Sequence, residues 1–210
     1  MASLRLKKED VGAFTQLYVL LSVIIFIVSQ QSLFFASFFI SPTNVLSSEP
    51  FSLANPWHYL RLFFHPFGHH SVLALCANAA FLFFLSPLVE KKYSKSILLG
   101  MFFTCALVSA SLTVAFFPNP IQGGTGFTFL YLLLCLIDSL EKQEFSFSLC
   151  IILILFLIRV FYEAVDEQDL SAFMHLVGSL VASILAFIHT KKPIRRKPVA
   201  KKEMKTKNKP

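Results

Sequence analysis

Long blocks of apolar residues, separated by short polar or proline-containing links, are the main pattern along this sequence. Six of these blocks approach the roughly 20 residues that an α-helix needs to cross the hydrocarbon core of a bilayer. They cover about residues 14–29, 71–89, 96–117, 125–138, 145–161 and 170–188. The pattern predicts an all-α fold, a polytopic membrane helix bundle with six transmembrane helices.

The segment between the first two blocks, residues 30–70, is too apolar for a loop in water. It is rich in phenylalanine, contains four prolines and includes the apolar stretch 33–40, which is too short to form another span. Trp57 and Tyr59 are residue types enriched at the membrane–water interface. We therefore expect this segment to lie partly in the membrane, supported by the bundle, because irregular backbone is not tolerated in bare lipid.

Composition supports the membrane class. Hydrophobic residues make up 55% of the chain, 25 of its 210 residues are phenylalanine, and only 15% are charged, against about 25% in soluble proteins. The net charge of +7 comes from the C-terminal tail, where residues 191–210 hold ten lysines and arginines and one glutamate. The body of the protein is slightly acidic, so the charge describes the tail and not the bundle.

Basic residues also orient the predicted helices. They gather at the N-terminus, at Lys91, Lys92 and Lys95 after the second block, and in the tail. Six spans place all three clusters on one side, and positively charged loops favour the cytoplasm. We predict a cytoplasmic N-terminus at 1–12, a membrane domain at 13–190 and a basic cytoplasmic tail at 191–210, in a bacterial inner (plasma) membrane. The tail is expected to contact anionic lipid; nucleic acid is not expected, since charge alone is a weak signal.

A glycine-rich stretch, Gly123-Gly124-Thr125-Gly126, leads into the fourth block. Glycine allows backbones to come close and tolerates positive φ. A hydroxyl at the start of a helix lies beside unpaired backbone N–H groups, which suits a nucleophile next to an anion-stabilising site. The alternative interpretation is that Thr125 is a helix N-cap.

Two polar residues are predicted at a similar depth to Thr125. His175 lies inside the sixth block and Asn78 inside the second, and an ionisable residue within a span is a functional candidate. Alternatively, His175 is a packing residue and Asn78 a hydrogen-bonding link between helices. Gly178 and Ala182 share a helix face with His175, so we expect this face to approach Gly126 of the fourth helix closely.

Three motifs, in order along the chain, resemble those of the rhomboid family of intramembrane serine proteases. Gly123–Gly126 is similar to the family's GxSG nucleophile motif, and His175–Gly178 to its HxxG motif. The pattern leading into the second helix is similar at Arg61, His65, His69 and Asn78. The resemblance covers about Arg61 to Phe187.

The resemblance implies a six-helix core, Thr125 as nucleophile, His175 as base and Asn78 in the oxyanion site, with no cofactor. The sequence departs from the family where serine is replaced by Thr125 and the helix-two histidine by Ala74. The aromatic residue that often packs on the catalytic histidine corresponds to Phe129. We expect no acidic residue inside the spans, so a hydroxyl–histidine dyad is the predicted arrangement.

Two functions stay open. One is an endopeptidase that cleaves transmembrane segments of membrane proteins near the outer face, and the other is an inactive pseudoprotease that binds client helices. A small transporter would predict repeat-related halves, which the sequence lacks. His65, His69 and His70 have no nearby carboxylate or cysteine to complete a metal site, so we interpret them as interfacial residues. The four cysteines have no metal-type spacing and are expected to be reduced and buried.

Overall fold

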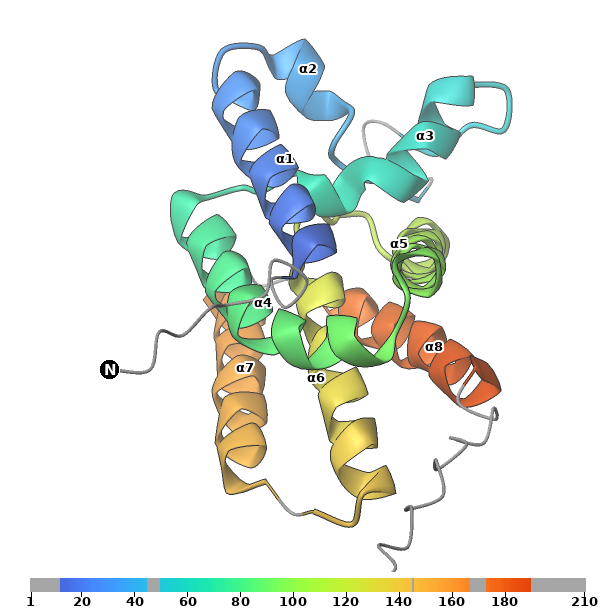
Figure 1. The fold of residues 1–210 in the computed structure, drawn as a ribbon. Coiled ribbons are helices and arrows are strands. Elements are labelled where there is room, and N and C mark those ends of the chain that lie inside the picture. The colour runs from blue at the N-terminus through green and yellow to red at the C-terminus, as the bar shows by residue number, and fades with distance from the viewer. Residues whose placement is uncertain (1–11, 45–49, 145, 167–172, 190–210) are drawn as a thin grey trace, which may run out of the picture.

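A computed structural model of the chain describes residues 12–44, 50–144, 146–166 and 173–189 (Figure 1). The predicted N-terminal segment, apart from its last residue, and the basic tail lie outside the described residues. The described helices are α1 (Ala13–Ser29), α2 (Leu33–Ser37), α3 (Pro56–Phe64), η1 (His65–Phe67), α4 (Val72–Lys92), α5 (Lys95–Phe116), α6 (Thr125–Glu141), α7 (Phe147–Asp166) and α8 (Phe173–His189).

Each predicted span corresponds to one of the longer helices, α1, α4, α5, α6, α7 and α8. Among the described helices, α4, α5 and residues Phe147–Val165 of α7 are long and apolar enough to cross a membrane, while α1 and α8 are shorter apolar helices. The all-α membrane bundle is therefore confirmed. That all six helices cross the bilayer stays a prediction, as does the side on which each end lies.

The segment between α1 and α4 forms three short helices instead of a continuous one. The Ser32 hydroxyl accepts a hydrogen bond from Phe35 N and so starts α2. Asn55 caps α3 in the same way, with Pro56 following at the first helical position, where proline is well tolerated. The apolar stretch 33–40 thus begins a separate short helix and does not extend α1.

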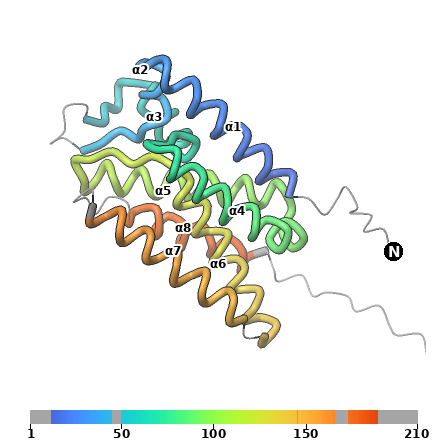
Figure 2. The backbone as a smooth tube through the Cα atoms, turned by 90° about the vertical axis from the view of Figure 1, so that its left-hand side faces the viewer, coloured from blue at the N-terminus to red at the C-terminus, as the bar shows by residue number. Residues whose placement is uncertain are grey.

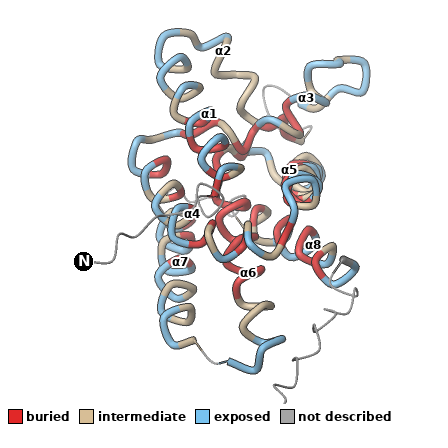
Figure 3. Tube along the Cα trace, viewed as in Figure 1, coloured by how far each residue is buried: buried red, intermediate tan, exposed pale blue. Residues whose placement is uncertain are grey.

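The most buried helix is α6, which packs against α4, α5, α7 and α8 (Figures 1 and 3). Residues Thr125–Leu132 of α6 are all buried, as expected for a helix that is apolar on every side. The ring of Phe127 packs edge-on against Tyr18 and Phe102, with centroids 4.8 and 5.0 Å away. These rings join α1 and α5 to the first turns of α6, where the predicted nucleophile lies.

The helix at the outside of the bundle is α7, which packs mainly against α6 (Figure 2). It ends at Asp166, five residues beyond the predicted end. Glu163, which lies beyond the predicted fifth block, therefore belongs to the helix. Arg159 and Glu163, one turn apart, form an ion pair of 2.9 Å, and such i,i+4 pairs support helix continuation.

The small residues of α8 contact a different helix from the one predicted. A side chain at Gly178 would meet the Cys105 carbonyl oxygen at 2.6 Å and Ser109 N at 3.1 Å, and both belong to α5. Gly178 therefore lets α8 approach α5, whereas we had expected α6. Ala182, one turn later, is fully buried. The helix α8 packs against both α5 and α6, and its residues His175 and Ser179 contact α6 at Gly126.

Candidate functional site

A tight turn places the first residues of α6. Gly123 has φ of +106°, a conformation that side chains other than glycine rarely adopt, and its N–H donates to the carbonyl of His65 at 3.0 Å. The helix then begins at Thr125, and its N-cap is Gly124 with no side-chain capping bond. The N-cap interpretation of Thr125 is therefore wrong. Thr125 is the first helical residue, and it is buried.

The contact between α6 and α8 is centred on Gly126 and His175. A side chain at Gly126 would lie 3.2 Å from His175 Nδ1 and 3.0 Å from Cys105 Sγ, so the imidazole fills the space that the glycine leaves. The Ser179 hydroxyl lies 2.6 Å from the carbonyl oxygens of both Gly126 and His175. Gly126 follows Thr125 directly, so the His175 ring lies against the first turn of α6, which begins at Thr125.

The His175 ring stacks on a second histidine. The centroids of the His65 and His175 rings are 5.6 Å apart, with 27° between their planes. His65 is fully buried and its Nδ1 lies 3.2 Å from the Leu62 carbonyl; burial lowers its pKa to about 3. Phe129, which we expected to lie on His175, instead stacks on Phe156 with centroids 5.5 Å apart.

His69 lies against the glycine turn. Its Nδ1 is 3.3 Å from the Phe67 carbonyl, so Nδ1 carries the proton and Nε2 is an acceptor. Gly124 N donates to Nε2 at 3.3 Å, and Asn78 Nδ2 lies 3.4 Å from the same atom. Burial lowers the pKa of His69 to about 4. His65 and His69 are therefore buried and neutral, and their depth relative to the membrane–water interface stays a prediction.

The Asn78 carboxamide is held on both sides. Its Oδ1 accepts hydrogen bonds from Arg159 Nη1 at 2.8 Å and Thr128 Oγ1 at 3.3 Å, while its Nδ2 faces His69. A guanidinium group only donates, so the oxygen must be the atom that faces Arg159. Asn78 therefore joins α4, α6 and α7.

Arg159 was missed by the sequence analysis, although the signal was present. A charged residue inside an apolar span is rare and marks a functional candidate, and this rule was applied to His175 but not to Arg159. The expectation that no acidic residue lies inside the spans also fails at Glu163 in α7. The pair was missed because the predicted helix ended before Glu163.

Thr125 and His175 belong to two helices that pack together, α6 and α8. Within the described parts of the chain, no hydrogen bond joins the Thr125 hydroxyl to the His175 ring. The ring instead lies against the backbone of Gln122. Ala74, at the position of the family's helix-two histidine, is buried one turn before Asn78 and brings no polar group. The nearest histidine to the Asn78 carboxamide is thus one from the loop, His69.

Arg61 supports the loop that precedes the glycine turn. Its Nε donates to the Ile40 carbonyl at 2.7 Å and its Nη2 to the Ser41 carbonyl at 3.3 Å. Ser41 in turn exchanges hydrogen bonds with Ile121, from N to O at 2.9 Å and from Ile121 N to Oγ at 2.8 Å. Arg61 therefore positions the chain two residues before Gly123 and does not enter the site itself.

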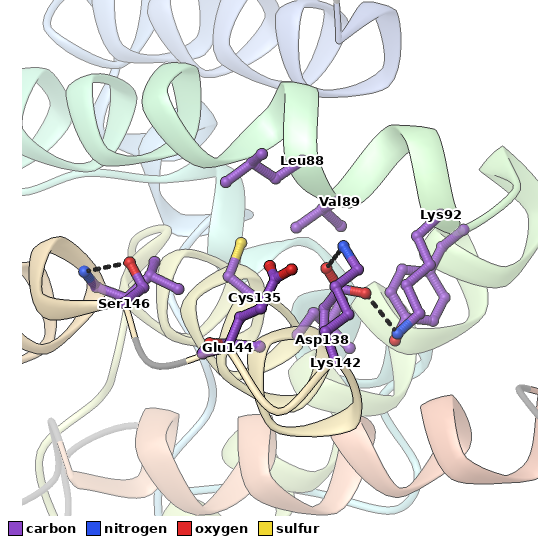
Figure 4. A pocket seen from close by; sticks show the side chains of 12 residues that line it. Leu88, Val89, Lys92, Cys135, Asp138, Lys142, Glu144 and Ser146 are labelled. Atoms are coloured by element: carbon purple, nitrogen blue, oxygen red, sulfur yellow. Dashed lines mark hydrogen bonds and ion pairs between the residues drawn. The ribbon is translucent and has the colours of Figure 1, made fainter.

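A second polar cluster occupies the opposite end of α4 and α6, around a hollow of about 310 Å³ (Figure 4). Asp138 lies between two lysines, 2.9 Å from Lys92 Nζ and 2.6 Å from Lys142 Nζ. Lys92 also pairs with Glu141. These ion pairs tie the end of α4 to the end of α6, and we assign them a structural role.

The described ranges contain no group of three or more histidine, cysteine, aspartate or glutamate residues placed to hold a metal ion. Of the cysteines, Cys105 and Cys135 are buried, Cys150 is half-buried and Cys76 is exposed. The expectation that all four are buried is wrong for Cys76, which lies on the outer face of α4.

Comparison with known families identifies a large matched region of the chain. A family model described as Rhomboid domain matches residues 56–192, well over half of the chain. The matched region includes Arg61, His65, His69, Asn78, the glycine turn and His175. No curated protein matches the chain.

Proposed function

The chain belongs to the rhomboid family of intramembrane serine proteases, and from this premise we propose that it binds transmembrane helices of other membrane proteins without cutting them. The observation that carries the proposal is the position of His69. Its Nε2 lies 3.3 Å from Gly124 N and 3.4 Å from Asn78 Nδ2. The Asn78 amide nitrogen, which the resemblance assigns to the oxyanion site, is thus directed at an atom of the protein itself, as is the N–H of Gly124.

Peptide hydrolysis by a hydroxyl requires free hydrogen-bond donors in the oxyanion site. The reaction builds negative charge on the carbonyl oxygen, and each hydrogen-bond donor that stabilises it is worth roughly 2.7–4 kcal/mol. The Nε2 lone pair of His69 instead accepts from the Asn78 amide nitrogen, and the low pKa of His69 keeps the ring neutral and accepting. Ala74 supplies no replacement donor.

The geometry of Thr125 supports the same proposal. A nucleophilic hydroxyl needs a base within hydrogen-bond reach, and no such bond joins Thr125 to His175 in the described residues. The threonine methyl group further restricts rotation about χ1. Internal threonine therefore lacks two features that favour attack, an aligned base and free rotation.

An apolar helix is the expected partner because the outer face of α7 is apolar and shallow. A hollow of about 540 Å³ on this face is lined by Leu157, Ile158, Phe161, Tyr162 and Val165. In the membrane this face meets lipid or another helix, and both are apolar. We propose that client helices pack here, next to Arg159.

A second function, endopeptidase activity, is favoured by a different observation. His175 Nδ1 lies within 3.2 Å of a side chain built at Gly126, so a small movement of α8 relative to α6 would bring an imidazole to the adjacent Thr125. In that mechanism Thr125 is the nucleophile, His175 the base and Asn78 an oxyanion donor, and cleavage falls near the outer face. Bonds in a resting site often shorten when substrate binds.

One experiment separates the two functions. The protein is reconstituted in liposomes with a fluorescent single-span probe whose helix carries glycine and proline near its outer end. A photo-crosslinking amino acid replaces Ile158, which is exposed on α7. We expect crosslinks to the probe, and no cleavage by wild type or by Thr125→Ser.

The contrary results are equally specific. Cleavage by wild type that is lost in Thr125→Ala would establish the endopeptidase and overturn the proposal. Absence of crosslinks, with a matched label at Leu140 on α6 as background, would overturn helix binding at α7. The double variant Thr125→Ser/His69→Ala tests the cause of inactivity, because it restores a serine hydroxyl and frees both donors.

A further inference from the structure

Arg159 is a charged side chain placed inside the bundle at the level of the candidate site. The side chain is 16% exposed and pairs with Glu163 on the same helix at 2.9 Å. Its Nη1 reaches across to Asn78 Oδ1 on α4 at 2.8 Å. Because a buried charge is costly within a membrane, the guanidinium is held where both acceptors are available.

This bond is a polar link between α4 and α7. The two helices also meet through an edge-on contact of Phe81 with Phe156, with centroids 5.7 Å apart. On its other side α7 is exposed along most of its length, for example at Ile154, Ile158 and Phe161. The position of α7 relative to α4 therefore depends on a small number of contacts, and one of them involves an ionised donor, which makes a stronger bond than a neutral one.

The same bond determines which way the Asn78 carboxamide faces. With Oδ1 held by Arg159 and by Thr128 of α6, Nδ2 can only face the other way, toward His69. Without Arg159, the amide would be free to turn over, since the oxygen and nitrogen ends of the group are nearly the same size. The Arg159–Asn78 bond thus links α7 to α4 and also determines where the Asn78 amide nitrogen points.

We propose that Arg159 is a clamp, which holds α7 against α4 and keeps the Asn78 amide nitrogen directed at His69. Glu163 keeps the guanidinium paired on its own helix. This inference goes beyond helix binding and holds whether or not the protein cleaves peptides.

The test measures the distance between α4 and α7 in the full-length protein in lipid nanodiscs. Cys76, which is exposed on α4, and Tyr162→Cys on α7 carry nitroxide labels, with Cys150 replaced by alanine. The variants are Arg159→Gln, Arg159→Lys and Asn78→Ala. Lys142→Gln, which breaks an ion pair at the far end of α6, is the matched control. A second label pair, Cys76 with Leu99→Cys on α5, reports general loosening.

We expect Arg159→Gln and Asn78→Ala to broaden the α4–α7 distance distribution toward longer values, while Lys142→Gln leaves it as in wild type. Lysine keeps the charge, so Arg159→Lys should restore much of the wild-type distribution. Asn78→Ala keeps the Arg159–Glu163 pair intact, so it carries the test if Arg159→Gln does not fold.

A second readout follows the carboxamide itself. The ¹⁵N resonance of His69 Nε2 should lose its acceptor character in part of the molecules of Arg159→Gln, because a turned amide presents oxygen to that atom. Wild-type distances in both Arg159→Gln and Asn78→Ala would overturn the clamp. Equal broadening of the distances of both label pairs would also overturn the clamp. Arg159 would then stabilise the whole bundle and not the contact between α4 and α7 in particular.

Discussion

The imidazole rings of His65 and His175 stack inside the bundle, with centroids 5.6 Å apart. One ring comes from the loop before α4 and the other from α8, so the stack joins the start of the family's motif pattern to its end. Arg61, Gly123 and Ser41 hold the loop side in place through backbone bonds. The ring of the predicted base therefore packs on a second buried histidine.

Replacing His65 with alanine should lower the free energy of unfolding, because the imidazole ring packs inside the bundle. His65→Ala removes a fully buried ring and leaves a cavity, and large-to-small changes of this kind cost roughly 2–5 kcal/mol. His65→Phe keeps the stack and should lose much less. Thermal unfolding in detergent checks this, and equal losses in the two variants would mean that ring stacking is not what His65 contributes.

Stability should fall as the pH drops below about 6.5. Burial lowers the pKa of His65 to about 3 and of His69 to about 4, whereas both titrate near 6.5 when unfolded. Between these values the unfolded chain binds more protons than the native one, so stability is fully present above pH 6.5 and declines toward pH 4. Each histidine contributes a slope of at most about 1.4 kcal/mol per pH unit.

The measurement is a series of melting curves between pH 8 and pH 5, with His69→Gln as the comparison. Glutamine does not titrate, so this variant should show a shallower dependence on pH than wild type. An unchanged slope would assign the acid sensitivity to other groups.

Two glycines in helices should respond in opposite ways to alanine. At Gly178 a methyl group would meet the Cys105 carbonyl oxygen at 2.6 Å, and overpacking of this kind costs roughly 1–3 kcal/mol. At Gly100 no atom lies within 4 Å, and alanine in a helix is favoured by roughly 0.5–1 kcal/mol. A lower melting temperature for Gly178→Ala and an equal or higher one for Gly100→Ala are expected. Tolerance of Gly178→Ala would contradict the close packing of α8 on α5.

Arg61→Lys should loosen the loop while leaving the helices intact. Lysine keeps the charge but cannot reach the carbonyls of Ile40 and Ser41 with two separate nitrogens. We expect faster amide hydrogen exchange at Ser41 and Ile121, whose N–H groups donate within this loop, and unchanged exchange in α5. Unchanged exchange at Ser41 would show that the loop holds its shape without the guanidinium.

Hydrophobic patterning determined most of the fold. Apolar blocks of near-membrane length gave the all-α bundle and the position of each long helix, because helix formation in lipid depends on local composition. Motif order identified the family, and the residues carrying it, from Arg61 to His175, lie in the matched region. Helix ends were less well predicted. The last turns of α7 contain the Arg159–Glu163 ion pair, and local hydrophobicity does not show that these charged residues continue the helix.

The direction of each side chain was decided only by the tertiary structure. Sequence spacing put Asn78, Thr125 and His175 at one depth. A carboxamide, however, faces whichever donors surround it, and the donors to Asn78 come from two other helices, α6 and α7. The packing of the whole bundle set His69 against Gly124, His65 against His175, and Gly178 toward α5. The residues of a site can be read along the chain, whereas their hydrogen-bond partners depend on contacts between segments that are distant in sequence.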